Sequence, residues 1–158
     1  DITPEGYRMA RWVPPPALIP TAAEDEHHFL GDGSTHLGRE IIGEVRLEIL
    51  QCERLPRLMV GVVDPYAVVV FEGFAARTSS VRNDRNPSWG VDTPRAFCFP
   101  VTCPYSTVDI AINDLDDMHT LVDYPIGRVV IDLSQLHGRT VYDCWYMLQK
   151  DMHKAVSL

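Results

Sequence analysis

The sequence has no apolar run that approaches the roughly 20 residues of a helix that crosses a bilayer, so it predicts a peripheral protein and not a transmembrane one. It has no basic stripe either, and its net charge is −8. Because phosphate contacts dominate the affinity of proteins for nucleic acids, this charge argues against a nucleic-acid partner. Anionic lipid surfaces also repel an acidic domain, so membrane binding would need a local device such as a bound cation or an apolar loop tip.

Catalytic motifs are also missing. The sequence contains no P-loop, no HExxH, no nucleophile elbow and no paired Cys/His signature, and its six histidines are scattered. We therefore predict that the protein is not an enzyme. The four cysteines show no CxxC pair and no zinc-ligand spacing, which predicts reduced, mostly buried thiols in a cytoplasmic protein. They are Cys52, Cys98, Cys103 and Cys144.

The sequence does contain many helix-breaking residues between short apolar runs. Twelve prolines and ten glycines interrupt a chain of 158 residues that is 46% hydrophobic. Such breakers deny the uninterrupted stretches that long helices need. The length suits one ordinary domain plus an extension. We interpret residues 1–40 as a proline-containing N-terminal extension or linker and residues 41–158 as the domain.

The N-terminal extension has an irregular pattern. The triple proline Pro14–Pro16 favours a stiff and extended chain. Paired histidines, His27 and His28, stand beside carboxylates and could bind a metal, but we favour a solvated linker. Several apolar residues could still pack the extension onto the domain, and these are Trp12, Val13, Leu18, Ile19, Phe29 and Leu30.

From Gly43 onward, apolar residues alternate with polar ones. Val45, Leu47 and Ile49 are separated by charged residues, which is the period of a strand with one face in water. Residues 65–72 are apolar on both faces and predict a central strand. The full set of predicted strands is 43–50, 65–72, 75–82, 96–101, 107–113, 126–133, 142–148 and 154–158. Such strands, separated by turn residues, predict an all-β fold, an eight-stranded antiparallel sandwich.

Four local signatures, in order, make residues 43–149 resemble a C2 domain. They are the opening strand and turn from Gly43 to Leu55-Pro56, Asp64-Pro65-Tyr66 before a hydrophobic strand, Asn86-Pro87-x-Trp89, and Asp114-x-Asp116 followed by Ile126-Gly127 and Trp145-x-x-Leu148. The resemblance implies a C2-type β-sandwich, a module of the calcium- and phospholipid-binding type. With Gly43 in the opening strand, it favours the second of the family's two strand topologies.

The resemblance also implies a candidate calcium site. Calcium-binding members gather carboxylates on loops at one end of the sandwich, where Ca²⁺ takes 6–8 oxygen ligands. The matching residues here are Asp64, Asp114, Asp116 and Asp123. Against calcium, Leu58 stands where those members have an aspartate. Asp123 also lies seven residues after Asp116, so the last aspartate of the family pattern has no certain counterpart in this sequence. Calcium is therefore a candidate cofactor that would bind weakly if it binds.

Two more surfaces are candidates for contact with a partner. The apolar residues Leu58, Met59, Val60, Leu121 and Val122 could insert into a bilayer interface or a partner groove, or could fold back and be buried. Many C2 domains hold phosphoinositides on a basic strand, and the matching region here offers Arg77, Arg82 and Arg85. Solvated strand residues are the alternative interpretation of these arginines.

These expectations leave two functions open. The first is a non-catalytic membrane-targeting module, cytoplasmic and peripheral, that binds phospholipid with weak or absent calcium dependence. The second is a calcium-independent protein-interaction or scaffolding domain of a larger multidomain protein. The aspartates between residues 114 and 123 favour the first function, and Leu58 favours the second.

Overall fold

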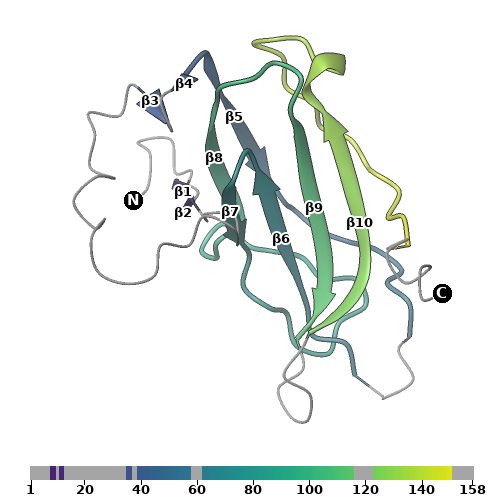
Figure 1. Ribbon diagram of the computed structural model, residues 1–158. Coiled ribbons are helices and arrows are strands. Elements are labelled where there is room, and N and C mark those ends of the chain that lie inside the picture. Colours follow the sequence, from purple (N-terminus) through teal and green to yellow (C-terminus); the bar gives the residue numbers. More distant parts are fainter. Residues whose placement is uncertain are drawn as a thin grey trace, which may run out of the picture.

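The computed structural model describes residues 39–57, 62–115 and 123–150, together with the short strands at 8–9, 11–12 and 35–36. In this part of the chain, two sheets pack face to face as a sandwich, accompanied by a single-turn 3-10 helix, Leu133–Gln135 (Figure 1). The predicted all-β antiparallel sandwich is confirmed, with fewer long strands than the eight expected. The predicted strand at 154–158 lies outside the described residues.

The larger sheet has five strands in the order β10-β9-β6-β7-β2, and all neighbours pair antiparallel. Its strands are β2 (Arg11–Trp12), β6 (Pro65–Phe71), β7 (Phe74–Arg77), β9 (Thr107–Asp114) and β10 (Tyr124–Asp132). The strand that is apolar on both faces, β6, lies in the middle, as its sequence predicts. It begins at a proline, where the missing N–H is tolerated.

The smaller sheet has the order β1-β8-β5 and contains β1 (Arg8–Met9), β5 (Gly43–Glu48) and β8 (Ala96–Val101). β5 pairs antiparallel with β8, whereas β1 pairs parallel with it. A separate hairpin joins β3 (Thr35–His36) to β4 (Arg39–Glu40) just before β5.

Two short strands, β1 and β2, lie within the predicted extension, at residues 8–9 and 11–12. Without the extension, β7 and β8 would both be edge strands, and their unpaired backbone groups provide templates for further pairing. β2 takes the edge of β7, and β1 takes the edge of β8. Residues 8–9 therefore extend the smaller sheet and residues 11–12 extend the larger one.

The core lies between the sheets and is sealed by two residues from loops. Phe71 and Phe99 meet edge to face with their ring centroids 5.9 Å apart, a geometry that aromatic pairs prefer. Leu55 and Trp89, from the loops, are each only 1% exposed. The Trp89 indole donates a hydrogen bond to the Ser79 carbonyl at 2.7 Å, so its polar atom is satisfied. This packing positions the loops that follow β5 and β7.

Two predicted strands differ in the structure. β7 ends at Arg77 and not near residue 82. The buried Thr78 hydroxyl accepts a hydrogen bond of 2.9 Å from the Ala67 N–H, and this side-chain bond competes with the backbone hydrogen bonds that would continue the strand pair. The predicted strand at 142–148 is absent from the described residues. An isolated bridge instead joins the following residue, Gln149, to Arg128, and Trp145 is 61% exposed.

Candidate functional site

Three connections meet at one end of the sandwich, which we call the loop end. They are the first loop between β5 and β6, the second between β7 and β8, and the third between β9 and β10, at the bottom of Figure 1. Backbone hydrogen bonds tie the first loop to the second, for example from Leu55 N to Arg85 O and from Asp84 N to Val63 O. The described parts of these loops therefore form one connected surface.

Asp64 links all three loops. Its backbone N–H donates to Asp114 Oδ1 at 2.7 Å, and its own Oδ1 accepts the N–H of Asn83 at 2.7 Å. Its carbonyl accepts the N–H of Leu115 at 3.1 Å. Two of the predicted metal-ligating residues, Asp64 and Asp114, are thus brought together, and each has a carboxylate oxygen that accepts a backbone hydrogen bond.

Asp123 is held by a different contact. The hydroxyl of Tyr66 donates a hydrogen bond of 2.5 Å to Asp123 Oδ2, so the tyrosine of the Asp-Pro-Tyr signature anchors the end of the third loop. Burial, helped by this hydrogen bond, raises the pKa of Tyr66. The guanidinium of Arg77 lies 4.4 Å from the centre of the same ring, which is a cation–π distance.

The carboxylates of the described residues do not fit a calcium ion by themselves. Asp64 and Asp114 adjoin, but no group of three or more His, Cys, Asp or Glu side chains in the described part could hold a metal. Two carboxylates already used as hydrogen-bond acceptors do not supply 6–8 oxygens. Asp116 lies outside the described residues.

The predicted apolar tip also falls in undescribed positions. Leu58, Met59, Val60, Leu121 and Val122 lie outside the described residues, and their insertion stays a prediction. Val62, which the sequence analysis did not single out, is described at the end of the first loop, with 51% of its surface exposed. An apolar side chain therefore does face solvent at the loop end.

The three predicted arginines lie in separate local environments. Arg77 stacks on Tyr66 from β7, Arg82 is exposed on the second loop, and Arg85 donates from Nε to the Leu55 carbonyl at 2.6 Å. Sequence reasoning missed two more exposed arginines, Arg54 and Arg57, which lie on the first loop. The signal was present, since both flank Leu55-Pro56 within the opening signature. The described residues of the first and second loops thus include four exposed arginines, which are Arg54, Arg57, Arg82 and Arg85.

No helix among the described residues has the length and apolar character needed to cross a membrane. All four cysteines are free of disulfides, as predicted. Burial is less uniform than expected: Cys98 is buried, Cys52 and Cys103 are partly buried, and Cys144 is exposed.

Comparison with known proteins adds to this geometry. The family model described as C2 domain matches residues 43–148, which is about two-thirds of the chain. Synaptotagmin-4 of Arabidopsis thaliana is 29% identical over 115 residues, covering 70% of this chain and 19% of its own length. A probable serine/threonine-protein kinase of Dictyostelium discoideum is 29% identical over 110 residues, 68% of this chain and 11% of its own. The chain therefore spans a fifth or less of these relatives.

Solved structures support the same fold. A C2 domain of RIM from Drosophila superposes with a TM-score of 0.58 at 22% identity, covering 67% of this chain and 86% of that one. A structure of two C2 domains of Extended-Synaptotagmin 2 superposes with a TM-score of 0.62 at 18% identity, covering 85% of this chain and 43% of that one. At these identities the likeness shows the fold alone.

Proposed function

The chain belongs to the C2 domain family, and from that premise we propose that it is a non-catalytic, peripheral membrane-targeting module. It docks its loop end onto anionic phospholipid with weak or absent calcium dependence. The observation that carries the proposal is the division of charges at this end. Four aspartates of the described loop residues, Asp64, Asp84, Asp114 and Asp123, accept hydrogen bonds, whereas four arginines there are exposed.

The exposed arginines provide a local attraction to an anionic surface, although the chain as a whole is acidic. With a net charge of −8, the protein is repelled on average by an anionic bilayer. A basic residue close to such a surface contributes about 1 kcal/mol of binding, so four of them supply a local attraction. Arg54 and Arg57 come from the first loop and Arg82 and Arg85 from the second, so both loops can face one bilayer.

Apolar contact is the second part of the proposal. Val62 is exposed on the first loop, which also carries Arg54 and Arg57, and in the sequence it directly follows the apolar residues 58–61. Burying its side chain in the interface adds to the electrostatic attraction. Leu58, Met59 and Val60 on the first loop and Leu121 and Val122 on the third are proposed to insert with it. No step in this docking depends on a metal.

Co-sedimentation with phosphatidylserine-containing liposomes tests the proposal. We expect binding in both calcium and chelator, and little change in an Asp64→Asn/Asp114→Asn variant. The Arg54→Gln/Arg57→Gln variant should bind more weakly, by roughly fivefold for each arginine. Val62→Asp should also weaken binding, while the matched control Val141→Asp, on an exposed residue outside the three loops, should not. Binding only in calcium, or equal binding by the arginine variant, would overturn the proposal.

A protein-interaction function is the second candidate, and one observation favours it. The segment 141–147 leaves a row of apolar side chains in solvent, among them Val141 at 91%, Trp145 at 61% and Met147 at 87% exposed. Exposed aromatic residues and methionine are typical of protein interfaces. If the protein binds liposomes in neither calcium nor chelator, the protein-interaction function is favoured over membrane targeting. The Trp145→Ser variant is then compared with the parent protein in the capture of a protein partner.

A further inference from the structure

Arg54, on the first loop, has a backbone conformation that arginine rarely adopts. Its φ is 56°, in the left-handed region, where the Cβ atom of a residue other than glycine is crowded against the following carbonyl oxygen. The next residue, Leu55, is only 1% exposed, so the bend at the exposed Arg54 turns the chain toward the core. This bend explains the conformation but not the choice of residue, because a glycine would adopt the same φ with less strain.

Three other residues besides glycine have a positive φ among the described residues, and they allow a comparison. Asn83 is of a residue type that tolerates this conformation. Glu72 uses its carboxylate to accept four hydrogen bonds, so its side chain has a structural role. Arg139, with φ of 60°, lies beyond the 3-10 helix, at the end of the sandwich opposite the loops (Figure 1). Residues under such strain are concentrated at functional sites, which makes Arg54, at the loop end, a candidate for binding.

The side chain of Asn86, on the second loop, holds the backbone of Arg54 in place. Asn86 Oδ1 accepts a hydrogen bond of 2.8 Å from the Arg54 N–H. The N–H of Asn86 donates in turn to Asp84 Oδ1 at 2.7 Å. Because the backbone of Arg54 is fixed, the direction of its Cα–Cβ bond is fixed too, and so is the side from which the guanidinium leaves the surface. The asparagine of the Asn86-Pro87-x-Trp89 signature therefore orients Arg54.

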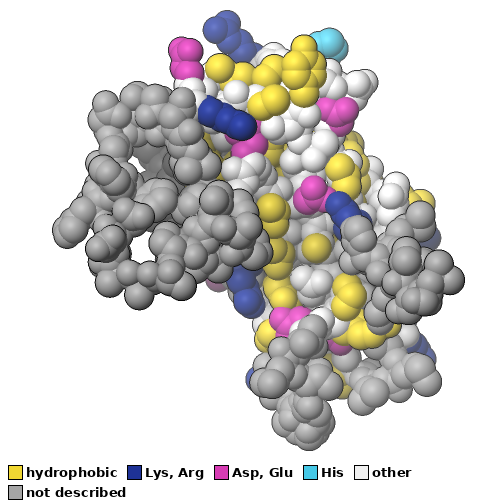
Figure 2. All heavy atoms as spheres, viewed as in Figure 1, with side chains coloured by type: hydrophobic (Ala, Val, Ile, Leu, Met, Phe, Trp, Pro, Cys, Tyr) yellow, Lys and Arg dark blue, Asp and Glu magenta, His cyan; other side chains and the backbone are white. Residues whose placement is uncertain are grey.

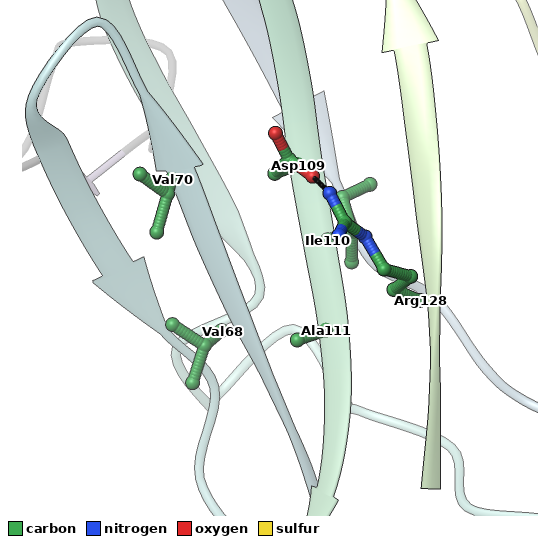
Figure 3. A pocket seen from close by; sticks show the side chains of 6 residues that line it. All are labelled: Val68, Val70, Asp109, Ile110, Ala111 and Arg128. Carbon is green, nitrogen blue, oxygen red and sulfur yellow. Dashed lines mark hydrogen bonds and ion pairs between the residues drawn. The ribbon is translucent and has the colours of Figure 1, made fainter. Parts of the chain in front are cut away.

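The guanidinium of Arg54 is available for an external anion. Elsewhere in the chain, Arg128 of β10 points toward Asp109 of β9 and forms an ion pair with it (Figure 3). Arg46 and Arg95 likewise form ion pairs with glutamates. On the face shown in Figure 2, basic side chains are scattered and several lie beside acidic ones. Within the described part of the chain, no carboxylate forms an ion pair with Arg54, so its exposed guanidinium keeps its charge and its N–H donors.

We propose that Arg54 binds a phosphate group of an anionic phospholipid through two parallel N–H donors of its guanidinium, and that Asn86 is the positioning residue that orients it. This inference rests on the proposed docking of the loop end and names the chemical group that is recognised there. A guanidinium presents a planar fork that matches two phosphate oxygens, whereas an ammonium is a point charge. The strain at Arg54 then has a functional reason, because it holds the fork in one orientation at the expense of some stability.

A lysine at position 54 separates this contact from a diffuse charge. Arg54→Lys keeps the charge and removes the fork, so in co-sedimentation with phosphatidylserine-containing liposomes in chelator it should bind about threefold more weakly than the parent. The matched control Arg57→Lys should bind as tightly as the parent. If Arg54→Lys binds as tightly as the parent, this inference is wrong and the proposed function stands. If the parent itself does not bind, both are wrong.

A glycine at position 54 should change stability and binding in opposite directions. Arg54→Gly relieves the strain, so it should raise the melting temperature by roughly 2–4 °C while it weakens liposome binding. Arg139→Gly is the matched control, because it relieves a similar strain away from the loop end. It should raise the melting temperature by a similar amount and leave liposome binding unchanged. An Arg54→Gly protein that melts no higher than the parent, or that binds as tightly, would contradict the inference.

A double-mutant cycle tests the role of Asn86. Asn86→Ala removes the acceptor of the Arg54 N–H, so it should weaken liposome binding about threefold in the parent and cause no further loss in the Arg54→Gly background. An asparagine that only maintained the fold of the second loop would affect binding in both backgrounds. A similar loss in both backgrounds would therefore overturn the positioning role.

Discussion

Glu72 joins the β6–β7 turn to the connection between β8 and β9, at the end of the sandwich opposite the loops. Its Oε2 accepts hydrogen bonds from the N–H and the hydroxyl of Thr102, both at 2.8 Å. Its Oε1 accepts from the N–H of Cys103 at 2.9 Å and from the hydroxyl of Ser106 at 2.6 Å. Glu72 does this from a backbone with φ of 46°, next to Gly73 at 86°, a left-handed pair that suits Asn-Gly better than Glu-Gly.

The substitution Glu72→Gln keeps the size and the backbone conformation while it removes the charge and half of the accepting capacity. Hydrogen bonds to a charged acceptor contribute roughly 1.5–3 kcal/mol, and solvent can replace part of what is lost at this half-buried site. We therefore expect the free energy of unfolding to fall by about 2 kcal/mol. For a domain of this size, that loss lowers the melting temperature by roughly 4–8 °C.

The stability that the Glu72 carboxylate contributes should depend on pH. Partial burial would raise the pKa of Glu72, but the hydrogen bonds from Ser106, Thr102 and Cys103 outweigh it, and the pKa is lowered. The stabilisation is therefore complete above the ordinary pKa of a glutamate and is lost as the pH falls through the folded-state value.

Urea denaturation followed by tryptophan fluorescence, at pH 7 and at about pH 3, measures both effects. The difference between parent and Glu72→Gln should shrink at the lower pH. Glu53→Gln, on an exposed residue, is the matched control and should change stability by less than about 0.5 kcal/mol. A Glu72→Gln protein as stable as the parent at pH 7, or a difference that persists at low pH, would refute the reasoning.

Two further predictions follow from single positions. A Cβ at Gly127 would lie 2.9 Å from the Gln149 carbonyl oxygen, so Gly127→Ala should lower the free energy of unfolding, measured by urea denaturation, by about 1–3 kcal/mol. The control Gly138→Ala, whose Cβ would have no atom within 4 Å, should show no comparable loss from overpacking. Burial raises the pKa of Cys52 to about 11, so at about pH 8 its alkylation, followed by mass spectrometry, should be at least tenfold slower than that of the exposed Cys144. Equal labelling rates would contradict the buried position of Cys52.

Much of the sandwich could be predicted, because strands with one buried face show alternating apolar and polar residues in the sequence. The alternation at Val45 and Leu47 and the doubly apolar β6 locate strands whose bounds differ from the prediction by one or two residues. The glycine of the Ile126-Gly127 signature also has a structural reason, because the Gln149 backbone lies against it. The segment 142–148 misled the prediction, because apolar content indicates a strand but not whether a partner strand is present for pairing.

The site was less predictable because it depends on contacts between distant residues. The sequence showed aspartates crowded along the chain, but not that Asp64 and Asp114 accept backbone hydrogen bonds across 19 and 50 positions. Nor could it show that the Tyr66 hydroxyl binds Asp123. The exposed Arg54 and Arg57 were missed because the predicted basic patch followed a single strand and the loop after it. The pairing of residues 8–9 and 11–12 was not predicted, because a strand of two residues is too short to show a period in the sequence.

The most direct test of the account asks which part of the molecule enters the bilayer. An environment-sensitive fluorescent amino acid can be placed at position 62, in place of Val62, and in a second protein at position 141, in place of Val141, since both side chains are exposed. With phosphatidylserine-containing vesicles in chelator, we predict a blue-shifted emission at position 62 and no shift at position 141. A shift at position 141 alone, or a shift at position 62 that appears only when calcium is added, would contradict docking of the loop end without calcium.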